Sequence, residues 1–153
     1  MHDKEITLFT NGLKHAHDEF FLDAISEFQI LVDEFPESEL VDDALYNIGL
    51  CYFEMNHFLK AVETYNQVIN DFPESTISIL EGGIEFGKTA AKCHYAILNC
   101  YLALNELDNS KKELDKLKKY TESYKLVEGR EIAFFELADN ALNTFMNIKS
   151  NNK

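Results

Sequence analysis

The sequence has few cysteines, few prolines and no long apolar run, and each shortage argues against a class of protein. Three cysteines in 153 residues, with no CxxC spacing among them, do not make a disulfide framework. Each lies in an apolar stretch of helical periodicity, so we expect buried, reduced thiols. No apolar run approaches the roughly 18 residues of a membrane-spanning helix, so membrane insertion is not expected. The first residues lack the basic start and apolar core of a secretory signal, which predicts a cytoplasmic protein, or a periplasmic one if the N-terminus was trimmed.

Basic side chains are also scarce, and they are unevenly distributed. The chain has 27 acidic and 14 basic residues, for a net charge of −13. Up to Glu85 there are 18 acidic and 3 basic residues, a balance of −15, whereas the remainder has 9 acidic and 11 basic residues, a balance of +2. An acidic front half repels phosphate backbones, so nucleic acid is not expected as a partner. The charge indicates a solvated surface, a basic partner or head-to-tail self-association.

Groups suited to catalysis or metal binding are not spaced as such sites require. His15 and His17 are two residues apart and therefore point to different faces of a helix. No Cys, His and carboxylate cluster has metal-ligand spacing, and no Ser, His and Asp set stands out. We expect neither catalytic residues nor a cofactor or metal.

What the sequence does contain is a repeat. Phe35-Pro36-Glu37-Ser38 returns 37 residues later as Phe72-Pro73-Glu74-Ser75, and the 27 residues from Gly12 to Ser38 show nine identities with their counterparts. Both prolines follow a helical stretch, where a residue without an N–H ends a helix at little cost. A fixed period of this size indicates stacked supersecondary units, which usually bind other chains.

The repeated residues resemble the tetratricopeptide repeat, a helix–turn–helix unit. The second copy carries that pattern on Leu45, Ile48, Gly49, Tyr52, Ala61, Tyr65, Val68 and Pro73. The first copy carries it on Leu8, Gly12, Ala24, Phe28, Leu31 and Pro36, with His15 where an aromatic is usual. A third, weaker copy has Leu98 in place of the glycine and Ser110 in place of the alanine. The FPES ending is similar to the subgroup of such repeats found in bacterial cell-envelope assembly proteins.

The resemblance implies an all-α, right-handed array of about three helical hairpins with a C-terminal capping helix. We predict a single domain over residues 1–153. Its predicted parts are repeats at about 5–38, 42–75 and 91–120, an insertion at about 76–90, and a C-terminal helix at about 122–148.

The insertion contains a string that matches a nucleotide-binding motif. Residues 82–89 satisfy G-x-x-x-x-G-K-[ST], the P-loop pattern. A P-loop belongs to a parallel sheet, and the rest of the chain offers only segments with helical periodicity. Glu81 and Glu85 would also place negative charge beside the phosphates. The insertion is therefore interpreted as a flexible linker or a helix extension, with its glycines permitting a bend.

The resemblance also implies a concave groove, lined by the second, fifth, ninth and twelfth positions of the first helix in each repeat. Those positions are Ile6, Phe9, Leu13 and Ala16, then Asp43, Tyr46, Leu50 and Phe53, then Lys92, Tyr95, Asn99 and Leu102. The Lys/Asn/Arg clamp with which some relatives bind C-terminal carboxylates is absent, and Phe9, Tyr46 and Tyr95 hold the fifth positions. The candidate partner-binding residues are thus Phe9, Leu13, Tyr46, Leu50, Phe53, Tyr95, Asn99 and Leu102. Such a groove favours an apolar or aromatic peptide or helix, unless the terminal helix or a second copy covers these side chains.

Three functions remain open on these residues. The first is a non-catalytic adaptor that binds a segment of another protein in the groove. The second is a self-associating structural or cell-envelope assembly component, which would form a homo-oligomer. The third is nucleotide binding through residues 82–89.

Overall fold

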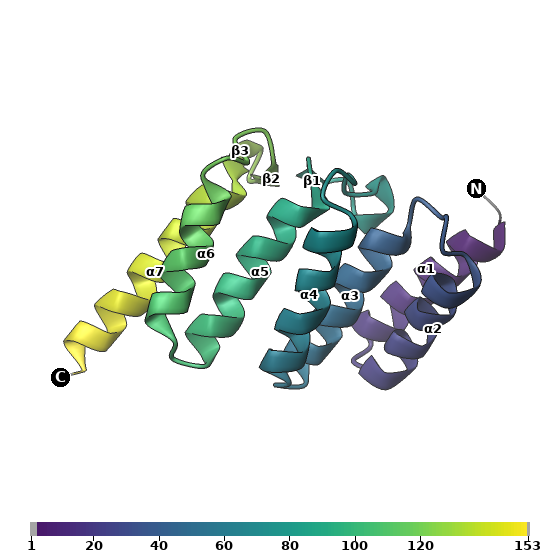
Figure 1. Ribbon diagram of the computed structural model, residues 1–153, viewed down its shortest axis with the longest axis horizontal. Helices are drawn as coiled ribbons and strands as arrows, with labels where there is room; N and C mark the ends of the chain where they lie inside the picture. The colour runs from purple at the N-terminus through teal and green to yellow at the C-terminus, as the bar shows by residue number, and fades with distance from the viewer. Residues whose placement is uncertain (1–2, 153) are drawn as a thin grey trace.

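A computed structural model describes residues 3–152 as an elongated row of helices with the two chain ends at opposite ends of the row (Figure 1). Within these residues the chain forms seven α-helices, which are α1 (Asp3–His17), α2 (Phe21–Glu34), α3 (Val41–Glu54), α4 (Phe58–Asp71), α5 (Thr89–Ala103), α6 (Leu107–Leu117) and α7 (Phe134–Asn151). One turn of 3-10 helix, η1 (Ile79–Glu81), and the strands β1 (Glu85–Phe86), β2 (Tyr124–Val127) and β3 (Arg130–Ala133) complete the fold. Met1, His2 and Lys153, which the predicted domain also includes, lie outside the described residues.

The helices pack as three successive hairpins. α1 packs on α2, α3 on α4 and α5 on α6, while α2 contacts α3 and α4 contacts α5 across the hairpins. α7 packs on α5 and α6 and forms the last helix of the row (Figure 1). This arrangement confirms the predicted helical-hairpin array. Cys51, Cys93 and Cys100 are buried within it as free thiols.

The three hairpin turns have the same backbone geometry. Glu19, Asn56 and Asn105 adopt left-handed φ values of 65°, 63° and 60°. The residue after each donates its N–H to the carbonyl five residues earlier at 2.8 Å, in the pairs Phe20–His15, His57–Tyr52 and Glu106–Tyr101. A helix ending of this kind closes the turn, and its hydrogen bond satisfies a carbonyl that the helix leaves free. The third hairpin therefore keeps the local structure of the first two, although its sequence has diverged.

Close helix contacts explain the small residues of the repeat. A Cβ placed on Gly12 would lie 2.5 Å from the Phe28 ring, and one on Gly49 would lie 2.5 Å from the Tyr65 ring. In the third hairpin Leu98 replaces the glycine, and the position equivalent to Tyr65 holds the smaller Leu114, which packs against the core cluster that contains Leu98. A larger residue on one helix is thus offset by a smaller one on the other, which keeps the core density close to constant.

The C-terminal helix begins later than predicted. Residues 122–133 were expected to be helical, but Tyr124–Val127 and Arg130–Ala133 form an antiparallel hairpin, and α7 starts at Phe134. Glu128 and Gly129 connect the two strands with φ values of 52° and 78°. Two successive left-handed residues make the type I′ turn that matches the twist of a two-residue hairpin.

The insertion is also more ordered than predicted. It is neither a linker nor a helix extension, because residues 79–81 form η1 and Glu85–Phe86 form β1. β1 pairs antiparallel with β2, so that the sheet has the order β1-β2-β3 at one edge of the row (Figure 1). The rings of Phe86 and Tyr124 stack at 5.2 Å between centroids. Backbone pairing and ring stacking with the C-terminal hairpin therefore hold the insertion in place.

The insertion leaves the end of the second repeat close to the start of α5. In the first repeat the Ser38 carbonyl accepts a hydrogen bond from the Val41 N–H at the start of α3. In the second, the Ser75 carbonyl accepts one from the Thr89 N–H, at 3.0 Å, at the start of α5. Residues 76–88 between them are looped out, and we call this segment the strap.

Candidate partner-binding groove

Helices α3 and α5 bring five of the predicted residues together. Tyr46, Leu50 and Phe53 follow one another at three- and four-residue spacing and so share one face of α3. They line a pocket of about 80 Å³ together with Tyr65, Tyr95, Ala96 and Asn99, which we call the α3–α5 pocket. The rings of Tyr46 and Tyr65 lie 5.5 Å apart. Burial raises the pKa of both phenols well above the usual value, so each stays neutral.

A second pocket continues from the first on the other side of Tyr95. This α5–α7 pocket has a volume of about 500 Å³ and is lined by Tyr95, Leu102, Leu137, Asn140, Ala141, Thr144, Phe145 and Ile148. The Tyr95 ring lies 6.2 Å from that of Phe134, at the start of α7. The two pockets share Tyr95 and together form what we call the groove. The described residues that line it are all uncharged.

α7 contributes residues that were not among the candidates. From the sequence we expected this helix to cap the end of the array, and Leu137, Ala141 and Phe145 were not expected on a binding surface. Their four-residue spacing is the signal of one helix face. α7 forms a wall of the α5–α7 pocket and is not among the elements that line the α3–α5 pocket.

Phe9 and Leu13 lie away from these pockets. Phe9 is 0% exposed and packs edge-to-face against Phe28, with centroids 5.7 Å apart. Its side chain is therefore part of the core of the first hairpin, and the expectation that it lines the groove surface does not hold. Leu13 is half-buried and packs against the same core.

The charged residues at the second groove positions are covered by the strap. The Ser78 N–H donates to Asp43 Oδ1 at 3.1 Å, and Asn47 Nδ2 donates to the Glu81 carboxylate. Lys92 Nζ lies 2.7 Å from Glu85 Oε1 and 3.6 Å from Glu81 Oε2. It also lies 3.9 Å from the centroid of the Tyr46 ring. Asp43 and Lys92 were carried over as groove positions, but the strap covers both side chains, so neither lies on the groove surface.

The P-loop-like string does not form a phosphate cradle. Its sheet is antiparallel, and the donors of Lys88 and Thr89 are already used within the protein. The Lys88 N–H donates to Ser123 Oγ at 3.0 Å, and Lys88 Nζ lies 2.6 Å from a Glu74 carboxylate oxygen. The Thr89 hydroxyl donates to Asp42 Oδ2 at 2.6 Å.

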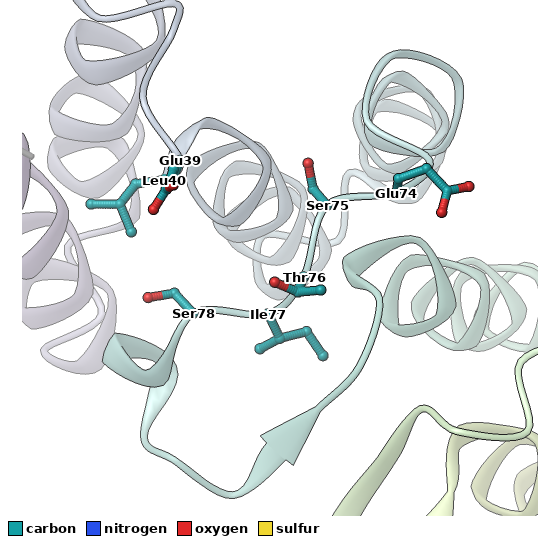
Figure 2. A pocket seen from close by; sticks show the side chains of 7 residues that line it. All are labelled: Glu39, Leu40, Glu74, Ser75, Thr76, Ile77 and Ser78. Carbon is teal, nitrogen blue, oxygen red and sulfur yellow. The ribbon is translucent and has the colours of Figure 1, made fainter.

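The entry of the strap carries a further hollow. Figure 2 shows Ser75, Thr76, Ile77 and Ser78 running from the end of α4 to η1, alongside Glu39 and Leu40. These residues and Glu74 surround a hollow of about 350 Å³. The carboxylates of Glu39 and Glu74 give it an acidic rim, which does not suit a phosphate.

Over 3–152, no helix is both long and apolar enough to cross a membrane. In the same part of the chain, no group of three or more His, Cys, Asp and Glu side chains is arranged to hold a metal ion.

Comparison with known proteins agrees with this geometry. Residues 43–75, which span α3 and α4, match the model of the tetratricopeptide repeat. The second hairpin is a tetratricopeptide repeat. No curated protein sequence matches the chain significantly.

Two solved structures have a fold similar to that of the whole helical array. The crystal structure of PcrH from Pseudomonas aeruginosa superposes with a TM-score of 0.69 over 95% of this chain and 94% of that one, at 14% identity. The Hsp90 co-chaperone Cns1 from Saccharomyces cerevisiae superposes with a TM-score of 0.68 over 99% of this chain, at 12% identity. The match covers 43% of the Cns1 chain, so this array spans less than half of that protein. At these identities the likeness concerns the fold.

Proposed function

We propose that this tetratricopeptide array is a non-catalytic adaptor that binds an apolar or aromatic peptide or helix of another protein in its groove. The observation that carries the proposal is the composition of the groove. Four large apolar or aromatic side chains, Tyr46, Leu50, Phe53 and Tyr95, surround the α3–α5 pocket, with Asn99 as the polar group among them. Aromatic anchors supply much of the binding energy at protein interfaces because they bury a large area at a small entropic cost.

The charge distribution supports an apolar partner rather than an acidic tail. The strap covers the Lys92 ammonium and pairs it with Glu81 and Glu85, so no cation of the described groove lining is free to pair with a partner's carboxylate. An apolar helix face would bury the groove without leaving a charged group unpaired. The name of Cns1 as an Hsp90 co-chaperone agrees with a role in protein interaction.

The test compares two leucine substitutions of the same kind. A helical peptide with an apolar face is first selected from a displayed peptide library against the wild-type protein, and its affinity is then measured by fluorescence anisotropy. Leu50→Lys places a charge in the α3–α5 pocket and should weaken binding by at least about tenfold, since burying an unpaired charge is costly. Leu59→Lys, on an exposed part of α4, should leave affinity unchanged.

The melting temperature of each variant is measured alongside, so that loss of binding is not confused with unfolding. A folded Leu50→Lys protein that binds the peptide as well as wild type would contradict the proposal. So would a library that yields no apolar peptide dependent on the groove.

Self-association as an assembly component is the second candidate. Ile148 lines the open α5–α7 pocket and is 56% exposed, which leaves an apolar surface that a second copy could cover. Sedimentation of the free protein over a range of concentrations distinguishes it from the adaptor. Nucleotide binding through residues 82–89 has less support, because the Lys88 and Thr89 donors are engaged within the protein.

A further inference from the structure

The strap is a loop whose two ends meet. Thr76 and Lys88 form an isolated antiparallel bridge, and the Ile77 N–H donates to the Gly87 carbonyl at 2.9 Å. The loop between them turns through Gly82 and Gly83, with φ values of 118° and 72°, which favour glycine. Its outer side faces solvent, where Ile79 is 82% exposed. A loop closed at its base can move as a unit when its other contacts are released.

Those other contacts join the strap to the C-terminal hairpin and to the groove wall. The Leu126 N–H donates to the Ile84 carbonyl at 2.8 Å, next to the β1–β2 pairing. Toward the groove, the strap is held by the Ser78–Asp43 and Asn47–Glu81 hydrogen bonds and by the ion pairs of Lys92. The strap is therefore held by buried polar side chains together with Ile77 and Leu80, which pack against the hydrophobic core.

The buried cluster carries more acid than base. Its described members include the carboxyl groups of Asp42, Asp43, Glu81 and Glu85 but a single lysine, Lys92. Asp43 is 1% exposed, and its Oδ2 atom has no hydrogen-bond partner among residues 3–152. A buried, unpaired carboxylate oxygen is costly, and the cost falls when the group is neutral.

The ionisable groups around Asp43 come from every element packed on it. They are Asp42 and Tyr46 on α3, Glu81 on the strap, Glu85 on β1, and Lys92 and Cys93 on α5. Desolvation opposes the charge of Lys92, but the face of the neutral Tyr46 ring and the carboxylates of Glu81 and Glu85 outweigh it, and the pKa of Lys92 lies above its usual value. Lys92 therefore stays charged, and the excess negative charge lies on the carboxyl side.

We propose that the strap closes one end of the groove in a proton-dependent way, with Asp43 holding the proton in the closed form and releasing the strap when the proton is lost. Burial, reinforced by the charges of Asp42 and Glu81, raises the pKa of Asp43 to about 8. With the strap open, Asp43 is hydrated and titrates near the ordinary value of about 4. The closed form thus binds a proton that the open form gives up.

The sign of the pH response follows from this difference. Between pH 4 and 8 the closed strap holds the proton and the open one does not, so the open population rises with pH by up to about tenfold per unit. Above pH 8 Asp43 is ionised in both forms, and the dependence levels off. Opening would uncover Asp43, Asn47 and Lys92 beside Tyr46 and add charge to a groove that is uncharged when closed. This consequence for a partner rests on the proposed function, whereas the response of the strap itself does not.

The experiment measures hydrogen exchange by mass spectrometry on the free, full-length protein at pH 6, 7, 8 and 9, with rates corrected for intrinsic exchange. The reporters are the two amides whose hydrogen bonds join the strap to the rest of the protein, namely that of Ser78, which donates to Asp43, and that of Leu126, which donates to the Ile84 carbonyl. In the wild type their opening equilibrium should increase by at least about tenfold from pH 6 to pH 8. Asp43→Asn keeps an acceptor for the Ser78 N–H but cannot titrate. The opening equilibrium of the strap in this variant should therefore change by less than about twofold over the same pH range.

Two further variants make the result decisive. Glu74→Gln makes the same kind of change at the base of the strap, where Glu74 pairs with Lys88 outside the buried cluster, and should keep the wild-type response. If Asp43→Asn does not fold, Glu81→Gln serves instead, because removing the neighbouring charge should shift the transition to lower pH. Strap protection that is the same at pH 6 and pH 8 in the wild type overturns the proposal. A pH response that persists in Asp43→Asn, or one in which α1 to α4 lose protection together with the strap, overturns it as well.

Discussion

Gly49 limits how closely α3 and α4 approach, and it gives a direct test of the repeat register. A Cβ there would lie 2.5 Å from the Tyr65 ring, which is 1% exposed and cannot move into solvent. Gly49→Leu should therefore lower the free energy of unfolding by about 1–3 kcal/mol through overpacking. Urea denaturation measures the change.

The third hairpin supplies the matched control for this substitution. It holds Leu98 and Leu114 at the positions of Gly49 and Tyr65. Combining Gly49→Leu with Tyr65→Leu should therefore recover part of the lost stability. An unchanged urea midpoint in Gly49→Leu would show that the helix contact is looser than the geometry indicates.

Residue-scale pattern predicted the small positions but not the burial of every aromatic. Gly12, Ala24, Gly49 and Ala61 were recognised because the period repeats them, and all four are buried. Phe9 holds the same fifth position as Tyr46 and contacts Phe28 as Tyr46 contacts Tyr65, yet Phe9 is fully buried. Sequence spacing gives the helix face, whereas the packing of the neighbouring helix decides whether a side chain on the edge of that face is covered.

At the scale of the elements, one of the three turns that join paired helices holds a residue that does not suit its backbone conformation. Asn56 and Asn105 occupy left-handed positions, which asparagine tolerates, but the equivalent residue of the first turn is Glu19. Glu19→Asn should raise the free energy of unfolding by about 0.5–1 kcal/mol because it relieves backbone strain. Chemical denaturation of the variant checks this value.

The reverse change in the second turn is the control. Asn56→Glu introduces the same strain and should lower stability by a similar amount. If both substitutions move stability in the same direction, side-chain contacts rather than the backbone decide the preference at these turns.

The strands were missed because their evidence is not local. β1 has two residues, and β2 and β3 have four each, too few to show a convincing alternation. β1 pairs with a strand about 40 residues later in the chain, and no periodicity in the sequence reports that pairing. The Glu128-Gly129 turn was the one local signal of the hairpin. Helices were predicted well because each contains its own period and because the repeat supplies it twice.

On the scale of the whole molecule, the groove combines parts that the repeat predicts with parts that it does not. Tyr46, Leu50, Phe53, Tyr95 and Asn99 line one pocket as the repeat register implies. The α7 wall and the covering strap lie outside the repeating units, so no counterpart in the sequence points to them. The charges of Asp43 and Lys92 are at groove positions by register, but only the folded strap shows that they are covered.

The hydrophobic core is divided into two clusters, and this division predicts that parts of the array can unfold locally. One cluster joins the first two hairpins to α5, and the other contains Ala91, Leu98, Leu117, Phe134 and Ala138 at the C-terminal end. Arrays of this kind are stabilised mainly by contacts between neighbouring units. Removing a side chain from one cluster should therefore destabilise the helices around that cluster more than the rest of the array.

Phe134→Ala tests this division, because Phe134 is 0% exposed and lies in the C-terminal cluster. Removing a buried ring of this kind typically costs about 3–5 kcal/mol, since both the transfer energy and the packing of its neighbours are lost. Hydrogen exchange should become faster in α6, α7 and the β2–β3 hairpin, while α1 to α4 keep most of their protection. Phe20→Ala, at an exposed ring near the other end of the row, should leave all regions close to wild type. Equal loss of protection from α1 to α7 in Phe134→Ala would instead mean that the array unfolds as one cooperative unit, with α5 coupling the two clusters so tightly that neither opens alone.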